Sequence, residues 1–173
     1  MLISKKLRLF FLPIIMAFIA LSMSGCKVYK FTDASVDPNL KSIRIQGLLN
    51  TAPYVNPQVN QNLTERLRQK IVNQTRLSQT NSDQAHLDVS GAVTDYSLST
   101  TGISDKREVT NRLTVTVHII VNNQLKNSKE EFDVSRSFEF AANLSLQQAE
   151  NQLLDEMVRS LTDDIFNRMF SNW

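Results

Sequence analysis

The stretch 112-RLTVTVHIIVNN-123 decides the fold. Apolar side chains occupy every second position along it: Leu113, Val115, Val117, Ile119 and Val121. Threonine, histidine and one isoleucine fill the inner positions between them. Because successive side chains of a β-strand point to opposite sides, this period of two predicts a long strand with one buried face and one largely polar face.

The segment 86-HLDVSGAVTDYSLS-99 predicts a second long strand. Its apolar positions alternate at first, but their parity shifts before Tyr96, which predicts a β-bulge near Thr94 and Asp95. A shorter strand is predicted at 42-SIRIQGLL-49, where isoleucines alternate with polar residues.

The third long strand is predicted at 131-EFDVSRSFEF-140, after a hairpin loop in 122-NNQLKNSK-129. Phenylalanine and valine occupy alternate positions of this strand, and Arg136 stands in the same row. Because a cation in an apolar row has to reach solvent or a negative partner, Arg136 is a candidate functional residue.

Two helices are predicted around these strands. Asn56 and Pro57 suit the N-cap and the first helical position. An apolar stripe at every fourth residue follows them: Val59, Leu63, Leu67 and Ile71. Ser145 and Gln148 have the spacing of a capping box before the last helix. The stripe of that helix has the same period: Ala149, Leu153, Met157, Leu161, Ile165 and Met169.

The order strand, helix, several antiparallel strands and helix predicts a single α+β domain over residues 42–173. The simplest arrangement is a two-layer sandwich, in which two helices pack on one face of a mainly antiparallel or mixed four-stranded sheet. The other face of the sheet, rich in threonine, serine and asparagine, is expected to stay polar and open.

The N-terminus has the anatomy of a secretory signal, with a basic start at Lys5, Lys6 and Arg8 and then an apolar run over residues 9–23. The run is shorter than the ~20 residues that cross a bilayer as a helix, and Pro13 interrupts it. Residues 1–25 are therefore expected to be a cleaved signal peptide, and residues 26–41 a polar lead to the domain.

The apolar run ends in 23-MSGC-26, which resembles the lipobox of bacterial lipoproteins. The resemblance implies cleavage before Cys26 and acylation of this new N-terminal residue. Cys26 is the only cysteine, so it has no partner for a disulfide within the chain. A reactive thiol would need a base such as histidine and a fixed pocket, which a polar lead does not provide. Two or three acyl chains would hold the protein firmly on a membrane.

The charge balance argues against nucleic acid as a partner. The chain has 19 Lys and Arg against 17 Asp and Glu, and residues 1–25 contain three of the bases and none of the acids. The remainder has 16 basic and 17 acidic residues, a formal charge of −1, whereas tight polyanion binding needs a concentrated excess of cations. No acidic residue follows Cys26 directly. By resemblance to lipoprotein sorting rules, this implies the periplasmic side of the outer membrane.

The sequence contains no catalytic or metal-binding motif: it has no H-E-x-x-H, no cysteine pair and no glycine-rich phosphate loop. His118 stands on the predicted polar side of its strand, where an exposed histidine is more common than a metal ligand or a base. Asp163 and Asp164 stand near Arg159 and Arg168 at helical spacing, which predicts surface ion pairs. We therefore expect no enzymatic activity and no cofactor.

Four basic residues are candidate phosphate ligands. Lys106 and Arg107 end a loop and Arg112 begins the clearest strand, so they form a small cationic spot. Arg136 can meet the same ligand if its strand lies alongside, since guanidinium groups bind phosphate in a bidentate manner. The alternative is that Lys106 and Arg107 pair with neighbouring acids and that Arg136 extends past its aromatic neighbours at a sheet edge.

The chain after residue 25 resembles the LptE family of lipopolysaccharide-assembly lipoproteins. The resemblance rests on the order and spacing of five segments: 25-GCKVYKF-31, 35-SVDPNLKSIRI-45, 52-APYVNP-57, 111-NRLTVTV-117 and 161-LTDDIFNRMFSNW-173. It implies an outer-membrane lipoprotein that sits as a plug in the lumen of a large β-barrel, LptD, assists the assembly of that barrel and binds lipopolysaccharide. The implied partners are thus the barrel, lipopolysaccharide and, through the acyl chains, the membrane. The resemblance assigns no role to the four basic residues, so their contact with lipopolysaccharide phosphate is inferred from chemistry alone.

Two other classes of protein fit the same sequence. One is an auxiliary lipoprotein of a different envelope transport system, which would copurify with an inner-membrane complex. The other is a lipid-binding lipoprotein that acts alone, which should have a sizeable apolar cavity and no stable barrel partner.

Overall fold

The strand predicted from the alternating stretch lies at the centre of the long strands of the sheet. In the computed structural model, which describes residues 36–54, 56–101 and 110–170, β5 (Thr110–Asn123) has a strand on each side. Four of its predicted core residues are 0% exposed: Leu113, Val115, Val117 and Ile119. One face of β5 therefore belongs to the hydrophobic core, as the period of two predicts.

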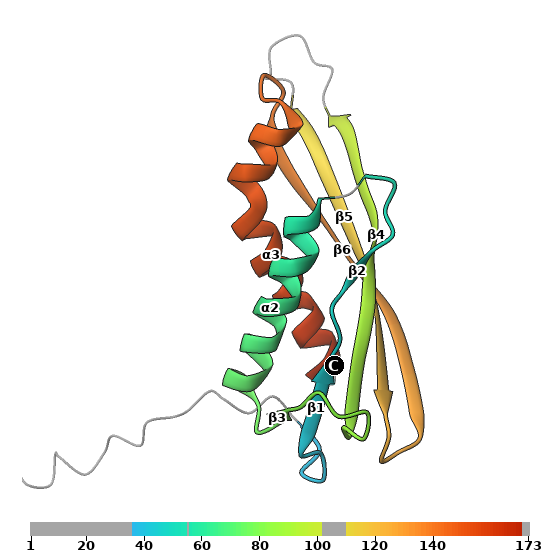
Figure 1. Cartoon of the computed structure of the whole chain (residues 1–173). Helices are drawn as coiled ribbons and strands as arrows, with labels where there is room; N and C mark the ends of the chain where they lie inside the picture. The colour runs from blue at the N-terminus through green and yellow to red at the C-terminus, as the bar shows by residue number, and fades with distance from the viewer. Residues whose placement is uncertain (1–35, 55, 102–109, 171–173) are drawn as a thin grey trace, which may run out of the picture. The chain divides into compact units, whose positions relative to one another are not determined.

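β5 pairs in antiparallel fashion with β4 (Leu87–Thr101) and with β6 (Ser128–Ala141). The register of β4 shifts between Val93 and Asp95, which confirms the predicted bulge. The turn from β5 to β6 contains Asn127 at φ 47°, a left-handed conformation that asparagine tolerates. The three long strands therefore run as one antiparallel meander (Figure 1).

Three short strands extend the sheet beyond β4. β1 (Ser42–Ile45) and β2 (Leu49–Asn50) both pair parallel with β4, and β3 (Ser78–Gln79) pairs parallel with β1. The sheet is thus mixed and six-stranded, in the order β3-β1-β4-β5-β6 with β2 also beside β4. The prediction of four strands is too low because β2 and β3 have 2 residues each, which is too short for a periodic pattern.

α2 (Pro57–Gln74) begins at the predicted residue. The side chain of Asn56 accepts a hydrogen bond from the backbone N–H of Gln58 at 3.1 Å, as an N-cap does. The predicted stripe is buried, with exposures between 0% and 1%: Val59, Leu63, Leu67 and Ile71.

α3 (Leu146–Phe170) has 25 residues and begins after the predicted capping box. The backbone N–H of Ser145 donates to Gln148 Oε1 at 3.0 Å, and the backbone N–H of Gln148 donates to Ser145 Oγ at 3.3 Å. Four residues of the predicted stripe are 0% exposed: Ala149, Met157, Leu161 and Ile165.

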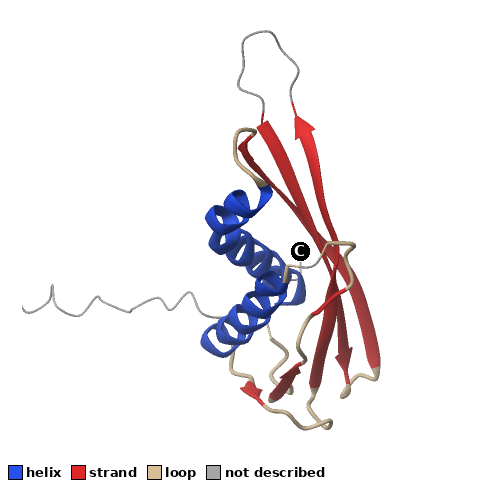
Figure 2. Ribbon diagram, turned by 45° about the horizontal axis from the view of Figure 1, so that its top comes forward, coloured by secondary structure: helices blue, strands red, loops and turns tan. Residues whose placement is uncertain are grey.

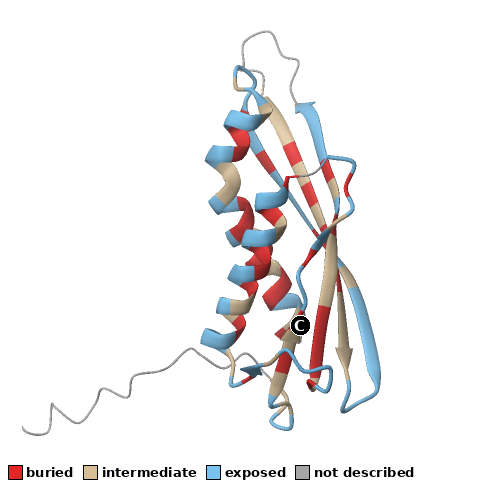
Figure 3. Cartoon of the chain, in the orientation of Figure 1, coloured by how far each residue is buried: buried red, intermediate tan, exposed pale blue. Residues whose placement is uncertain are grey.

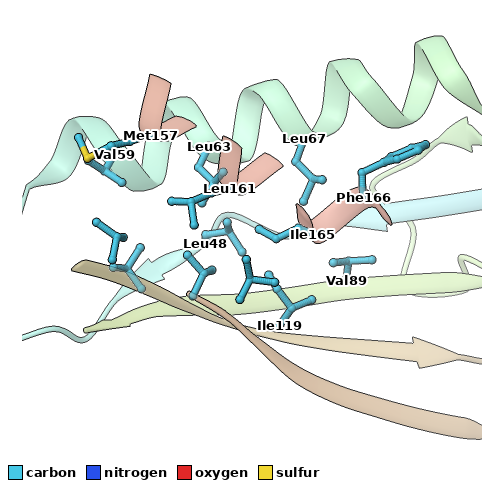
Figure 4. Close-up of a cluster of buried hydrophobic side chains, with 14 of the residues drawn as sticks. Leu48, Val59, Leu63, Leu67, Val89, Ile119, Met157, Leu161, Ile165 and Phe166 are labelled. Atoms are coloured by element: carbon cyan, nitrogen blue, oxygen red, sulfur yellow. The ribbon is translucent and has the colours of Figure 1, made fainter. Parts of the chain in front are cut away.

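Both helices cover the same face of the sheet, which confirms the two-layer α+β arrangement (Figures 1 and 2). Buried and intermediate residues alternate along the middle of β5 (Figure 3). Between the layers, Leu63 and Leu67 of α2 lie with Leu161 and Ile165 of α3 above the strands (Figure 4). Burying a leucine or isoleucine side chain contributes about 1.5–3 kcal/mol, so this shared core holds the helices on the sheet.

Gly91 of β4 marks a close approach between strands. A Cβ atom at this position would lie 2.3 Å from the backbone oxygen of His118 and 3.0 Å from Ile119 Cδ1. Any other residue would therefore push β4 away from β5. β1 and β2 pair with the opposite edge of β4 close to this position, so the displacement would disturb their pairing as well.

Candidate functional site

The side of the sheet that faces away from the helices is a polar surface, which we call the open face. Directly opposed residues of antiparallel strands share a face, so the register places the apolar Ala92 and Ile120 on it together with many polar residues of β4, β5 and β6, among them Asp95, Ser97, Ser99, Arg112, Thr114, Thr116, His118, Glu131, Asp133, Ser135, Ser137 and Glu139. Hydroxyl groups pair across the strands, Thr114 with Ser137 at 2.9 Å and Thr116 with Ser135 at 3.0 Å. The centre of the open face is thus an array of hydroxyls that can exchange hydrogen bonds with water or with a polar partner.

Pairs of ionisable side chains flank this hydroxyl array. At one end, Arg112 Nη2 donates to Glu139 Oε1 at 2.8 Å. At the other end, His118 Nδ1 lies 2.7 Å from Asp133 Oδ1, and His118 Nε2 lies 3.6 Å from Glu131 Oε2. Lys129 also pairs with Glu131 and lowers the pKa of that carboxyl below its usual value. An anion approaching this part of the open face therefore has to compete with carboxylates that already hold the cations.

A tighter ion pair joins β1 to β4. Arg44 donates through Nε and Nη2 to the two carboxylate oxygens of Asp88, each at 2.8 Å, and Gln46 Nε2 adds contacts at 3.1 and 3.0 Å. Arg44 also pairs with Asp83. The bidentate contact from Arg44 holds the pKa of Asp88 below its usual value. This network fixes the parallel register between the first strand and the meander.

The structure separates two of the four candidate phosphate ligands. Arg112 lies opposite Glu139, on the open face, whereas Arg136 lies opposite Val115, on the helix face. Arg136 pairs there with Asp164 of α3, with Nη2 donating to Oδ1 at 2.7 Å. β6 does lie alongside β5, as the prediction required, but the two guanidinium groups point to opposite sides of the sheet. Lys106 and Arg107 lie outside the described residues, as does Cys26.

The two neighbouring aspartates of α3 bind other elements of the fold. Asp163 Oδ1 lies 2.6 Å from Nζ of Lys70 on α2, and Asp164 pairs with Arg136 on β6. The Lys70 ammonium also lies 5.0 Å from the ring centroid of Phe166. The ion pairs predicted within one helix are therefore replaced by pairs that connect α3 to both of its neighbours.

A buried glutamate with two tyrosine partners was not predicted from the sequence. Glu150 of α3 is 6% exposed and accepts a hydrogen bond from Tyr96 Oη at 2.8 Å and from Tyr54 Oη at 3.3 Å. The two tyrosine rings stack with centroids 5.3 Å apart. Burial raises the pKa of the Tyr96 phenol, and the Glu150 carboxylate raises it further. The cluster ties the segment before α2, the middle of β4 and the start of α3 together.

Among the described residues, a partly open pocket of about 400 Å³ lies near the start of β4. Its apolar wall includes Val36, Leu40, Val121 and Phe170. Nζ of Lys126 lies 3.1 Å from Asp37 Oδ2 beside it, so an ion pair ties the segment before β1 to the β5–β6 turn.

Two negative observations apply to residues 36–54, 56–101 and 110–170. No group of three or more histidine, aspartate or glutamate side chains is placed to hold a metal ion there. No helix in that part of the chain is long and apolar enough to cross a membrane.

The fold and the open face define a two-layer α+β module with a hydroxyl-rich sheet surface. The family model of LptE, described as lipopolysaccharide assembly, matches residues 40–169. The chain belongs to the LptE family. It is therefore an assembly lipoprotein with a role in lipopolysaccharide assembly and outer-membrane biogenesis, and it is not an enzyme.

Solved structures with a similar fold come from several bacteria. A neuraminyllactose-binding hemagglutinin homolog from Helicobacter pylori superposes with a TM-score of 0.56 at 9% identity, over 77% of this chain and 87% of that one. At this identity the likeness shows a shared fold alone. Uncharacterized lipoprotein B from Nitrosomonas europaea gives a TM-score of 0.49 at 16% identity, over 76% and 83% of the two chains. Rare lipoprotein B from Shewanella oneidensis gives 0.41 at 17% identity, over 70% and 92%. No curated protein matches the sequence.

Proposed function

We propose that this chain is the lipid-anchored subunit of the lipopolysaccharide translocon on the periplasmic side of the outer membrane. In this proposal it sits as a plug in the lumen of the LptD β-barrel, assists the assembly of that barrel and contacts lipopolysaccharide during insertion. The observation that carries the proposal is the match of the LptE family model across residues 40–169. The open face gives it a physical basis, because hydroxyls and the Arg112–Glu139 ion pair stay hydrated and suit the wall of a water-filled lumen.

Affinity purification of the tagged chain from detergent-solubilised envelopes tests this function. We expect a large outer-membrane β-barrel in near-equal amount to the chain, identified by mass spectrometry. Recovery of an inner-membrane ATPase complex in place of a barrel would contradict the proposal and would favour an auxiliary role in another transport system.

We propose further that residues 1–25 are removed and that Cys26 carries the acyl chains. The variant Cys26→Ala should remain an unprocessed precursor that does not incorporate labelled palmitate. Ser22→Ala is the matched control, because Ser22 precedes the lipobox-like segment and its loss should leave processing unchanged. Normal palmitate labelling of Cys26→Ala would show that the anchor is elsewhere.

The phosphate ligands in this proposal are Lys106, Arg107 and Arg112. Arg136 would have to reach phosphate separately, from the helix face and in competition with Asp164. Charge reversal of Arg107 together with Arg112 should weaken binding of purified lipopolysaccharide while the circular dichroism spectrum stays unchanged. Arg136→Gln serves as the comparison from the other face of the sheet. An unchanged affinity of the double variant would remove Arg107 and Arg112 from the site.

A further inference from the structure

The pocket near the start of β4 lies where the helix face of the sheet extends past the end of α3. Val121 and Glu130 are opposite each other in the register of β5 and β6, on the helix face, and both line the pocket. Near the end of α3, the Arg168 guanidinium lies 5.8 Å from the ring centroid of Phe132, two positions along β6 from Glu130. Phe170, the last residue of α3, also lines the pocket. The pocket therefore occupies the place that the next turn of α3 would cover.

The other side of the pocket belongs to residues 36–41, which we call the entry segment because the chain passes through it into β1. Val36 and Leu40 line the pocket and pack against the hydrophobic core. The backbone N–H of Leu40 donates to Asp37 O at 2.9 Å. The entry segment and the β5–β6 turn lie at the same end of the domain (Figure 1). The pocket thus separates the end of α3 from the entry segment, and a side chain that filled it would join the two.

Trp173 is the residue that the pattern of α3 directs towards this pocket. The apolar stripe repeats every four residues, and Trp173 continues it after Ile165 and Met169. Residues four apart share a face of a helix, and here Ile165 is 0% exposed and Met169 lines the pocket. Trp173 lies outside the described residues, but only three positions after Phe170, a span of at most about 11 Å. The pocket is therefore within reach of the Trp173 side chain.

The chemistry of the pocket suits an indole ring. Pockets that hold drug-sized molecules begin at roughly 300 Å³, so one bicyclic side chain fills much of a volume of about 400 Å³. Val36, Leu40 and Val121 offer apolar contacts. An indole also has one N–H donor, which needs an acceptor when it is buried. Glu130 lines the pocket, and no side chain in the described part of the chain forms a hydrogen bond or an ion pair with it, so its carboxylate is available as that acceptor.

We propose that Trp173 binds in this pocket and fastens the entry segment to the end of α3. The ring would pack against Leu40 and Val121 and donate its N–H to Glu130. The inference does not rest on the proposed function, because it concerns this chain alone. It does set where the tether to the membrane begins. Val36 follows Cys26 by ten residues, a span of at most about 36 Å, so with acyl chains on Cys26 this end of the domain would stay within that distance of the bilayer.

Fluorescence tests the proposal directly, because Trp173 is the only tryptophan of the chain. The full chain is purified without partners and reconstituted into vesicles of phosphatidylethanolamine and phosphatidylglycerol. We expect an emission maximum to the blue of that of free tryptophan, with little quenching by aqueous acrylamide. Vesicles with brominated acyl chains should also quench little, which distinguishes a ring in the pocket from a ring in the bilayer.

A pair of serine variants locates the ring. Ser128 is exposed and lines the pocket, so Ser128→Phe should fill the pocket without disturbing the core. It should shift the emission to the red and increase quenching by acrylamide. Ser135→Phe is the matched control, because Ser135 is equally classed as exposed but lies on the open face, opposite Thr116. It should leave the emission unchanged, and the circular dichroism spectra of both variants should match that of the wild type.

Hydrogen exchange measures how firmly the entry segment is held. Its reporters are the backbone N–H of Leu40 and that of Lys41, which donates to His86 Nδ1 at 3.0 Å. Trp173→Ala should speed their exchange about tenfold or more. A tenfold factor corresponds to about 55 Å² of buried apolar surface, and an aromatic side chain buries about 150–250 Å². Asn172→Ala is the control, because position 172 lies outside the stripe, and it should leave exchange unchanged.

The opposite results would overturn the proposal. Strong quenching of the wild type by acrylamide would place the ring in water, and strong quenching by brominated chains would place it in the bilayer. Unchanged emission of Ser128→Phe would exclude the pocket as its site, and unchanged exchange in Trp173→Ala would exclude the fastening of the entry segment. Because these measurements use the chain without a barrel, such results would leave the proposed function standing.

Discussion

Replacing Tyr96 by phenylalanine should destabilise the domain by removing one hydrogen bond to a buried acid. Tyr96 is 7% exposed and its hydroxyl donates to Glu150 Oε1 at 2.8 Å, while Glu150 itself is 6% exposed. The variant leaves the shape of the ring unchanged, so the loss is confined to the hydroxyl. Of its side-chain hydrogen bonds from the described part of the chain, Glu150 would keep only the longer one from Tyr54, at 3.3 Å.

The expected size of the effect follows from the type of bond. A hydrogen bond to a charged group contributes about 1.5–3 kcal/mol to the free energy of unfolding. For a domain of this size each kcal/mol shifts the melting temperature by about 3–5 °C, so Tyr96→Phe should lower it by roughly 5–15 °C. Tyr54→Phe is the matched control. Tyr54 is 42% exposed and its contact is longer, so its loss should cost under about 1 kcal/mol.

Thermal and urea unfolding followed by circular dichroism measure these differences, and a double-mutant cycle with Glu150→Gln isolates the charge. In the Glu150→Gln background the Tyr96→Phe cost should fall to that of a neutral hydrogen bond, about 0.5–1.5 kcal/mol. Equal losses for Tyr96→Phe and Tyr54→Phe, or a Tyr96→Phe cost that does not depend on Glu150, would refute the assignment of Glu150 as the buried acceptor.

Three further predictions concern the framework. Gly91→Ala should lower the free energy of unfolding by several kcal/mol, because its Cβ would lie 2.3 Å from the backbone oxygen of His118; a melting temperature equal to that of the wild type would contradict the close approach. Leu161→Ala should cost about 2–5 kcal/mol in urea unfolding, since Leu161 is 0% exposed, and a cost under about 1 kcal/mol would mean that the layers repack. Arg44 lowers the pKa of Asp88 in the folded protein. Their pair therefore stabilises the fold at pH values above the pKa that Asp88 has in the unfolded chain, and this stability is lost as the pH falls through the lower pKa of the folded protein. The wild type should therefore lose more stability than Asp88→Asn between about pH 6 and pH 3, and parallel pH profiles would argue against the pair.

Much of the fold could be predicted because local chemistry determines it. The alternation of apolar and polar residues over residues 112–123 predicted the central strand. The shift in the alternation of apolar positions before Tyr96 predicted the bulge. Asn56 and the pair Ser145–Gln148 correctly predicted where the two helices begin. The hydrogen bonds of a helix cap join residues only two or three positions apart, so the local sequence is enough to recognise them. Each of these features is encoded in a short window of sequence.

The missing parts depend on contacts between distant residues. β2 and β3 exist only because another strand lies beside them, so their two residues show no pattern of their own. The partner of Arg136 is Asp164, 28 residues away, and only the packing of α3 on β6 brings them together. Strand register likewise decided that Arg112 and Arg136 lie on opposite faces, and a shift by one residue would have reversed this result.

The parallel pairing of β1 with β4 also bears on the order in which the domain is made. Arg44 and Asp88 are 44 residues apart, so β1 leaves the ribosome long before the strand that fixes it. Until then Ile43 and Ile45, both buried in the finished domain, can contact only elements made before β4, among them β3 and α2, whose Arg68 donates a hydrogen bond to Ile45 O at 2.9 Å. Closing so long a loop is slow compared with forming the β4–β5–β6 meander. The first strand of the domain to be synthesised is therefore among the last to be locked in place.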